Sequence, residues 1–223
     1  MKKIRYCLFL FAVIGLFGFS WPFDWLFVST NSEKFGTNNW VERQMQILKP
    51  RASNIDSKVL RLSLIAYAKA KQRGLTDDGK QLLTVIDYSK PSSENRLWVF
   101  DLKRGKALFN TYVSHGRNSG GLNATSFSNS PGSLKSSIGV FLTKQPYIGK
   151  NGYSLRLRGL EPGINDNAYN RSVVVHGQVG RSWGCPAVSD DLAKSLINTI
   201  KDNTLIVAYY PDRNWLSNSR FLT

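Results

Sequence analysis

The sequence predicts an α+β protein, in which a predominantly β domain of sandwich- or barrel-like mixed sheets carries an N-terminal helical layer. Three observations support this. Apolar residues recur at helical spacing before Gly74, short strand-like segments separated by turn-rich stretches follow Leu82, and one further helical segment interrupts this second half. The chain has 223 residues with 42% hydrophobic content, so we expect one main core with an appendage.

The helical layer is predicted over residues 40–80 as a hairpin packed on the β domain. Residues 40–48 form a short amphipathic segment, which Pro50 ends. Asp56 can cap a second helix, in which apolar residues recur every three or four positions until Gly74 stops it. We expect these helices to cover part of the β domain.

The mainly β part is predicted over residues 81–210. Apolar and polar residues alternate at 154–158, which is typical of a strand with one face in a core and a basic face outward. Ser189 can cap a helix that ends near Asn203. We expect residues 211–223 to form a frayed or surface-draped tail. The predicted strands cover residues 82–87, 97–102, 107–113, 154–160, 172–176 and 205–210.

The first twenty residues have the pattern of a secretory signal peptide. Three basic residues precede an uninterrupted apolar segment at 6–19. Cleavage after Ser20 fits the small residues there, whereas the apolar stretch 21–28 would allow an uncleaved membrane anchor. We expect export to the periplasm or cell envelope, leave both forms of the N-terminus open, and assign residues 21–39 to a linker.

The chain is strongly basic, with 30 Lys and Arg residues against 15 Asp and Glu residues and a formal net charge of +15. Such an excess favours polyanionic partners, such as nucleic acid, anionic lipid or the carboxylate-rich peptides of a cell wall. Because export is predicted, we expect the cell wall rather than nucleic acid. Arg156, Arg158 and Arg171 are expected on solvated strand faces, with a role in holding an anionic substrate as the alternative. The oligomeric state stays open.

A single cysteine remains once residues 1–20 are removed. Cys185 then cannot belong to an internal disulfide, so it is inert, bonded to another molecule, or reactive. Only eight residues separate it from His176, which ends an apolar strand, so a tight turn would bring the two together. We predict Cys185 as nucleophile and His176 as its base, with the backbone amides of Gly184 and Cys185 as oxyanion donors. We expect the imidazole and Arg181 to lower the thiol pKa.

Further residues are candidates for substrate binding. Arg181 can clamp a carboxylate or face solvent, Ser182 can bond near the sulfur or stabilise a turn, and Trp183 can form a cleft wall or belong to the core. His115 follows another predicted strand, where it can line the same cleft or be satisfied by the backbone. Residues 118–132 can form a binding loop or a plain surface loop. We expect no metal and no other cofactor, because no further ligand accompanies the two histidines and the cysteine.

These motifs resemble one known family. His176-Gly177 followed by Ser182-Trp183-Gly184-Cys185 is similar to the HG...S-x-G-C signature of the L,D-transpeptidase catalytic domain, the YkuD-like family of cysteine enzymes of bacterial cell-wall crosslinking, and within it the murein branch. The resemblance covers roughly residues 59–208, including the segments 83–92, 96–101, 114–117 and 127–129.

The resemblance implies a reaction as well as a fold. The Cys185 thiolate would attack the carbonyl of the third residue of a peptidoglycan tetrapeptide stem, expel the terminal D-alanine and form a thioester, which an acceptor amine resolves. Water as acceptor would give an L,D-carboxypeptidase, and loss of activity would leave a murein-binding relative. The interval 177–184 is shorter than is usual in the family, which leaves the stem contacts open. An unrelated cysteine peptidase fits less well, because His176 precedes Cys185.

Overall fold

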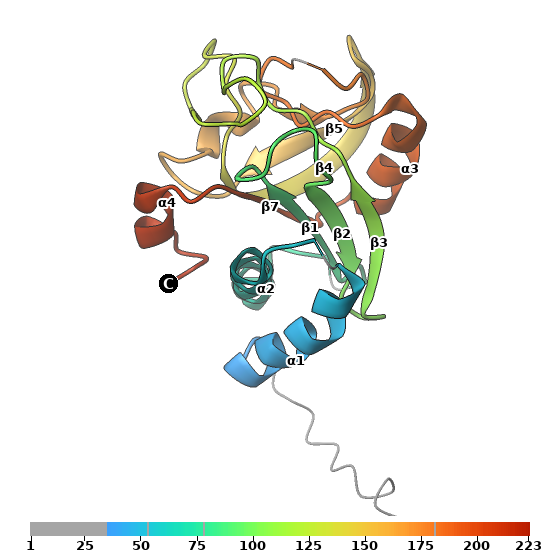
Figure 1. The fold of residues 1–223 in the computed structure, drawn as a ribbon, viewed down its shortest axis with the longest axis vertical. Helices are drawn as coiled ribbons and strands as arrows, with labels where there is room; N and C mark the ends of the chain where they lie inside the picture. The colour runs from blue at the N-terminus through green and yellow to red at the C-terminus, as the bar shows by residue number, and fades with distance from the viewer. Residues whose placement is uncertain (1–34, 53, 78, 181) are drawn as a thin grey trace, which may run out of the picture. The chain divides into compact units, whose positions relative to one another are not determined.

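A mixed seven-stranded sheet organises the computed structural model, which describes residues 35–52, 54–77, 79–180 and 182–223 (Figure 1). Its strands are β1 (Leu82–Asp87), β2 (Leu97–Asp101), β3 (Lys106–Thr111), β4 (Gly139–Gly149), β5 (Gly152–Gly159), β6 (Val174–Val175) and β7 (Leu205–Tyr209). Their order is β3-β2-β1-β7-β4-β5-β6, with β1 and β7 parallel and all other neighbours antiparallel. The predicted α+β fold is confirmed, whereas the predicted signal or anchor lies outside the described residues.

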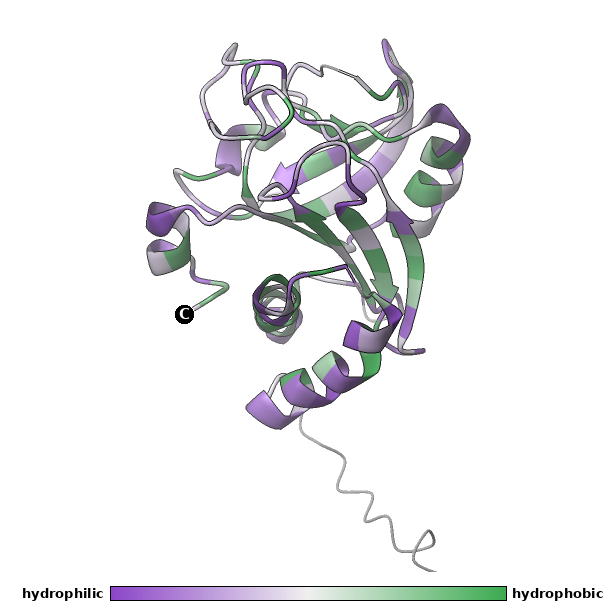
Figure 2. Ribbon diagram, viewed as in Figure 1, coloured by the Kyte–Doolittle hydropathy of each residue, from purple (hydrophilic) through white to green (hydrophobic). Residues whose placement is uncertain are grey.

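Two N-terminal helices form a layer beside this sheet. Helix α1 spans Asn38–Leu48 and helix α2 spans Ser57–Gln72, and α2 packs against β1 and β7, whereas α1 packs on α2 (Figure 1). The Asp56 side chain caps α2 by accepting from the Lys58 and Val59 backbone N–H groups at 2.8 and 3.1 Å. Figure 2 shows both helices with apolar and hydrophilic residues interleaved, as expected for helices buried along one side. The predicted helices therefore form a layer on the sheet.

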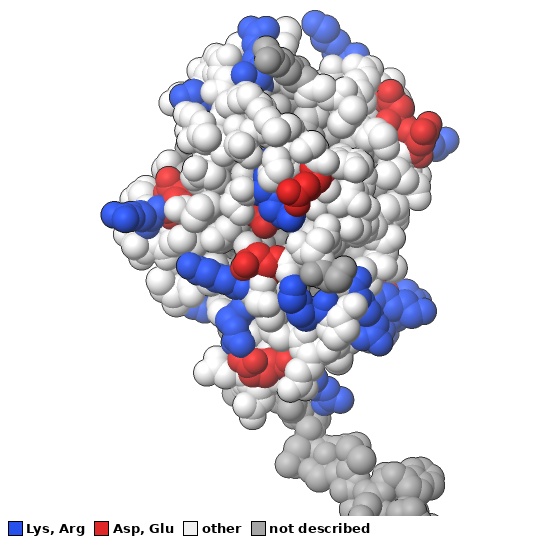
Figure 3. Space-filling model, viewed as in Figure 1, with Lys and Arg blue, Asp and Glu red and all other residues white. Residues whose placement is uncertain are grey.

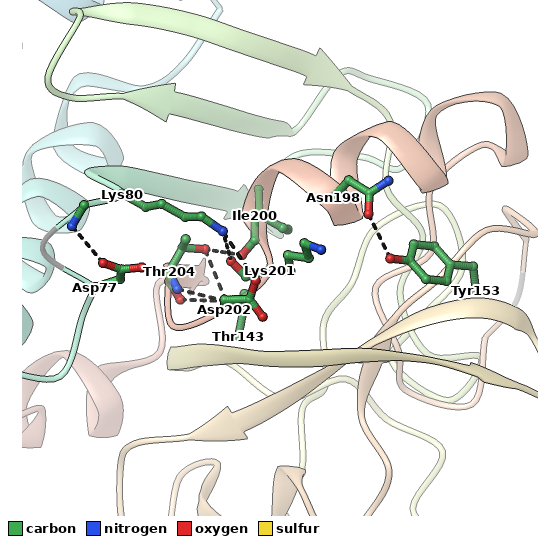
Figure 4. A network of polar contacts seen from close by, with 10 residues as sticks. Asp77, Lys80, Thr143, Tyr153, Asn198, Ile200, Lys201, Asp202 and Thr204 are labelled. Atoms are coloured by element: carbon green, nitrogen blue, oxygen red, sulfur yellow. Dashed lines mark hydrogen bonds and ion pairs between the residues drawn. The ribbon is translucent and has the colours of Figure 1, made fainter.

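The turn between α3 (Asp190–Ile200) and β7 fixes the start of the parallel strand. Thr204 N–H donates to Thr143 Oγ1 at 2.9 Å, and Asn203 N–H donates to the Thr143 carbonyl oxygen at 3.0 Å. Lys80 Nζ donates to the Lys201 carbonyl oxygen at 3.1 Å (Figure 4). These bonds join β4, the approach to β1 and the end of α3. The Thr204 hydroxyl also donates to the Ile200 carbonyl oxygen, one of the acceptors that the end of α3 leaves without a helical partner.

Strand β4 is the one strand of the described sheet that the sequence did not predict. It contains Pro146 between Gly139 and Gly149, residues that normally argue against a strand. The pairing of β4 with β5 shifts register between Thr143 and Pro146, so an irregularity accommodates the residue that lacks an N–H group. Beyond this point the β4–β5 hairpin continues to its turn at residues 149–152.

The C-terminal segment is packed, which corrects the prediction of a frayed or surface-draped tail at 211–223. Residues Arg213–Asn218 form helix α4, and the Trp215 and Phe221 side chains are fully buried. The segment is mostly polar, but burial of two aromatic side chains outweighs the entropy of ordering it.

A buried carboxylate holds this segment to the sheet. One Glu161 oxygen accepts from the Val140 backbone N–H at 2.7 Å and from Trp215 Nε1 at 3.0 Å. Its other oxygen accepts from the Ser219 hydroxyl. Burial raises the pKa of Glu161, and these hydrogen bonds offset part of that shift.

The surface agrees with the basic composition. On the face drawn in Figure 3, Lys and Arg side chains lie in several separate groups, with smaller groups of Asp and Glu between them. Within the described part of the chain, no helix combines the length and the apolar content needed to cross a membrane.

Candidate active site

The segments that carry His176 and Cys185 lie side by side. His176 and Ala187 form a parallel bridge, in which Val188 N–H donates to the His176 carbonyl oxygen at 2.9 Å and His176 N–H donates to the Pro186 carbonyl oxygen at 3.4 Å. Residues two apart on an extended segment point the same way, so Cys185 shares a face with Ala187 and therefore with His176. The structure thus brings together the two residues predicted as nucleophile and base.

Both side chains line a cavity of about 390 Å³. Three parts of the chain enclose it: the end of the β4–β5 hairpin, the segment through β6, and the loop before Cys185. The lining residues are Tyr147, Lys150, Asn151, Arg171, Ser172, Val174, His176, Gln178, Ser182, Trp183 and Cys185. Most of these side chains are polar or charged, and a concave site of this volume is typical of small-molecule binding.

Burial favours the protonated form of the Cys185 thiol. Its side chain is 8% exposed, and Sγ donates to the Ser172 carbonyl oxygen at 3.6 Å. Burial raises the pKa of the thiol, and a hydrogen bond with the Val174 backbone and the positive charge of Arg171 only partly offset this. The expectation of a lowered thiol pKa is therefore wrong, because burial dominates, and the described cation that offsets part of the shift is Arg171. Arg181 lies outside the described residues, so its effect on the thiol stays a prediction.

Burial likewise favours the neutral form of His176, and a hydrogen bond fixes its tautomer. Nδ1 bonds the Gly177 carbonyl oxygen, and because a carbonyl only accepts, Nδ1 carries the hydrogen. The other ring nitrogen, Nε2, then holds the lone pair. Burial lowers the pKa of His176, while the Gly177 bond and the Asp190 carboxylate raise it by less. The pair is thus a thiol and a neutral imidazole that can accept its proton.

A tight turn presents the cysteine. The Ser182 hydroxyl donates to the Cys185 carbonyl oxygen at 2.6 Å and accepts from the Gly184 N–H at 3.2 Å. Gly184 has φ 119°, a conformation that favours glycine. Of the two predicted oxyanion donors, the Gly184 N–H is thus engaged, while the Cys185 N–H donates to no acceptor within the described residues. The position of Ser182 matches the turn-stabilising alternative.

Arg171 lines the Cys185 cavity and is half-buried, which corrects the prediction that it lies on a solvated strand face. Its half-buried guanidinium donates to the Ser128 and Lys135 carbonyl oxygens at 2.6 and 2.7 Å, and to the Ser137 and Ser133 hydroxyls at 2.6 and 3.1 Å. It therefore connects the serine-rich loop, residues 126–137, to the surroundings of Cys185. The signal was that loop's unusual number of serines, whose partner the sequence does not identify.

Ser136 connects the same loop to the turn. Its hydroxyl donates to the Gly184 carbonyl oxygen at 3.1 Å and accepts from the Gly116 N–H at 2.9 Å. Residues 118–132 lead into this hydrogen-bonded stretch. The segment predicted as a binding or surface loop is therefore continuous with residues that hold the turn at 182–185.

Trp183 is exposed at the wall of the cavity. It is 65% exposed, which excludes the core alternative. The Lys150 ammonium lies 5.0 Å and the Arg117 guanidinium 6.0 Å from its ring centroid. These cation–π contacts connect the loop before Cys185 to the β4–β5 turn and to the segment after β3.

His115 lies in a different cavity, which corrects the prediction that it lines the same cleft. It is 6% exposed and lines a space of about 430 Å³ together with Val179 and Gly180, whereas Gln178, Ser182 and Trp183 line the Cys185 cavity. Arg96 Nη2 donates to His115 Nδ1 at 2.8 Å. Burial lowers the pKa of His115, and the Arg96 charge lowers it further. The hydrogen bond from buried Arg96 therefore orients the His115 ring.

No cluster of three or more His, Cys, Asp or Glu side chains suited to a metal ion occurs among the residues whose positions are described.

Comparison with known proteins identifies the family. No curated protein matches the chain. Among solved structures, L,D-transpeptidase 1 of Mycobacterium tuberculosis is 16% identical with a TM-score of 0.38, covering 59% of this chain and 62% of that one. An L,D-transpeptidase from Mycobacterium smegmatis is 15% identical with a TM-score of 0.38, covering 59% of each chain. One from Stackebrandtia nassauensis is 13% identical with a TM-score of 0.38, covering 76% of this chain and 77% of that one.

The chain spans about three fifths of the length of the two mycobacterial structures. The family model described as the L,D-transpeptidase catalytic domain matches residues 51–209, which include α2, all seven strands and both members of the Cys185–His176 pair. Because this match covers more than half of the 223 residues, the chain belongs to the L,D-transpeptidase catalytic-domain family.

Proposed function

We propose that this protein is a cysteine-dependent L,D-transpeptidase that acts on the peptide stems of peptidoglycan. The observation that carries the proposal is the placement of the Cys185 thiol and the His176 imidazole on one face of two adjacent segments, within one cavity. The family match supports the reaction class. The basic surface agrees with a carboxylate-rich polymer as partner.

The first half-reaction acylates the cysteine. As Sγ attacks the carbonyl carbon of the third stem residue, His176 Nε2 takes the thiol proton, and the carbonyl oxygen becomes an oxyanion. The Cys185 N–H is the available donor for that oxyanion. When the tetrahedral adduct collapses, the bond to the terminal D-alanine breaks and its nitrogen receives the proton from His176. The products are a thioester and free D-alanine.

The second half-reaction releases the enzyme. An acceptor amine attacks the thioester carbonyl carbon while neutral His176 takes a proton from it, and the leaving sulfur recovers that proton. A new amide bond joins two stems. With water in place of the amine, the same steps give a tripeptide, and the protein would act as a carboxypeptidase. The residues of this chain supply the base and its orientation in both cases, and no cofactor takes part.

Arg171 has a positioning role in this proposal. Its charge favours the thiolate that forms transiently, and its bonds to the serine-rich loop keep it beside Cys185. The same loop holds the Gly184 carbonyl through Ser136. We further propose that the protein works in the periplasm or cell envelope, on the basis of the signal-like residues 1–20.

The proposal is tested with the purified full-length protein, kept in mild detergent because of its apolar N-terminal segment. It is incubated with disaccharide tetrapeptide, and both the products and the intact protein are weighed by mass spectrometry. We expect a covalent adduct of the stem minus D-alanine on the wild type, and none on Cys185→Ala. His176→Gln should slow its formation by about a hundredfold or more.

The products distinguish the alternatives. Crosslinked dimers identify a transpeptidase, tripeptides alone identify a carboxypeptidase, and unaltered substrate with unchanged binding in Cys185→Ala identifies a murein-binding relative. Absence of any adduct on wild-type protein that circular dichroism shows to be folded would overturn the proposed function.

A further inference from the structure

A basic groove lies next to the active-site cavity. It has a volume of about 740 Å³ and is lined by the outward-facing side of the β4–β5 hairpin and by the segment before β6. Tyr147 lines both the groove and the Cys185 cavity, so the two spaces share a wall. The charged and aromatic groove residues are Lys144, Tyr147, Arg156, Arg158, Asp166 and Tyr169.

Strand geometry places the arginines in this groove. Leu155 and Leu157 are buried beneath β5, so Arg156 and Arg158, which alternate with them, project from the opposite face. Both arginines therefore occupy fixed positions on a paired strand rather than on a loop. This is the outward basic face that the sequence pattern predicts.

The groove has an unbalanced positive charge. Three cations line it, and within the described residues none of Lys144, Arg156 and Arg158 forms an ion pair with a carboxylate. The single acidic residue, Asp166, is engaged elsewhere. Its Oδ1 accepts from Asn129 Nδ2 at 2.7 Å and from the Gly163 N–H at 2.9 Å. The group that would complement the groove is an anion.

Arg156 is held in a fixed orientation. Its guanidinium carbon lies 4.2 Å from the Tyr147 ring centroid and 5.8 Å from that of Tyr169. Such stacking occupies the faces of the guanidinium and leaves its N–H edges free. Among the described residues these N–H groups have no acceptor. An arginine prepared in this way suits a carboxylate, which accepts two parallel hydrogen bonds from the guanidinium edge.

We infer that the groove is a carboxylate-binding subsite in which Arg156, supported by Arg158, selects stem peptides that carry a free carboxylate over their amidated counterparts. This inference rests on the proposed function, because the shared Tyr147 wall puts a ligand in the groove within reach of an acyl group at Cys185. The stem is the anion in question, since one molecule can then occupy both spaces. Tyr147 and Tyr169 position Arg156 rather than contact the reacting atoms.

The test separates binding from catalysis. Two tetrapeptides are titrated into the full-length Cys185→Ala protein by calorimetry. One carries free side-chain carboxylates and α-carboxylates at positions that are not part of the scissile bond, and the other carries carboxamides at the same positions. We expect the free-carboxylate peptide to bind about tenfold more tightly, as one charge-assisted bidentate contact allows. Added salt should reduce this preference.

Arg156→Gln in the same background should abolish the preference and leave the affinity for the amidated peptide unchanged. Lys106→Gln is the matched control, because it removes an exposed cation on β3 outside the groove and should leave the preference intact. A preference that survives both Arg156→Gln and the double variant Arg156→Gln/Arg158→Gln overturns the subsite.

The adduct measurement on the wild type keeps the two proposals apart. Adduct formation with equal affinity for both peptides would refute the subsite and leave the transpeptidase proposal standing. A carboxylate preference lost in Arg156→Gln, with no adduct on the wild type, would keep the subsite and refute the transpeptidase.

Discussion

The carbonyl oxygen of Lys135 fills the space beside Gly184 in which a side chain would lie. A Cβ built on Gly184 would be 2.7 Å from that oxygen, and Arg171 holds the oxygen in place with a 2.7 Å hydrogen bond. The residue before the cysteine is therefore restricted by contact as well as by its positive φ. The serine-rich loop, Arg171 and the turn at 182–185 therefore form one packed unit.

This contact predicts that Gly184→Ala destabilises the protein. The added methyl group would meet backbone rather than a flexible side chain, and the φ of 119° is strained for alanine, so we expect a loss of about 2 kcal/mol or more in the free energy of unfolding. Chemical denaturation monitored by tryptophan fluorescence measures it. Gly121→Ala is the control, because a Cβ there meets nothing within 4 Å. Equal stability of the two variants would contradict the packing argument.

The raised pKa of the Cys185 thiol predicts slow alkylation at neutral pH. Only the thiolate reacts with iodoacetamide, so the rate should climb with pH and reach its midpoint above the ordinary thiol value of about 8.5. Arg171→Gln removes a charge that lowers this pKa, and should move the midpoint to higher pH still. Glutathione provides the exposed-thiol reference. A midpoint below that of glutathione would show a preformed thiolate instead.

The lowered pKa of His176 predicts the acidic limb of the acylation profile. The base must be neutral, so acylation should rise as pH increases through a midpoint below the ordinary histidine value of about 6.5. Asp190 raises the pKa of His176, so Asp190→Asn should shift the limb to lower pH while keeping an oxygen that can accept from the Gln178 N–H. Asp191→Asn, a neighbouring exposed aspartate, should leave the profile in place. A shift to higher pH in Asp190→Asn would refute this assignment.

Glu161 predicts a pH dependence of stability. Its pKa is raised in the folded protein, so its contribution to stability is fully present below the ordinary glutamate pKa of about 4.3 and is lost as pH rises through the folded value. Gln at this position keeps an acceptor for the Val140 and Trp215 N–H groups, and its amide can donate to Ser219. The thermal midpoint of Glu161→Gln relative to wild type should therefore increase from pH 5 to pH 8.

Glu161→Ala provides the contrast. It leaves three buried donors without their acceptor, so we expect a loss of about 3 kcal/mol or more at every pH. If Glu161→Gln were destabilised as strongly as Glu161→Ala, the carboxylate charge would be required, and burial would not be the dominant influence on Glu161.

Local patterns were sufficient for much of the fold. The strand predicted at 82–87 is β1, and the helices predicted before Gly74 form, because their apolar spacing coincides with their buried faces. Strand β4 escaped prediction because Pro146 is accommodated by an irregularity that depends on the partner strand. The packing of the C-terminal segment was not predicted, because Trp215 and Phe221 are isolated in a polar stretch. Residues far away along the chain form the site in which they are buried.

The site divides in the same way. The short interval between His176 and Cys185 predicts their proximity, since an eight-residue connection limits how far two strand ends can separate. The direction of the thiol pKa shift was not predictable, because it depends on burial by the whole fold. The same holds for Arg171, whose partners lie 34 to 43 positions away along the chain. His115 and His176 both follow strands, but only contacts such as that with Arg96 determine which cavity each one enters.

The burial that favours the protonated form of Cys185 also has a consequence for the proposed work of this residue in the cell envelope. Oxidants and mixed disulfides attack sulfur through its ionised form, so a thiol that keeps its proton is slow to become sulfenic acid or to be capped. In the proposed reaction, the proton leaves when a carbonyl carbon arrives beside the imidazole. Burial of the sulfur would then limit side reactions with oxidants and keep its nucleophilicity for the bound acyl donor.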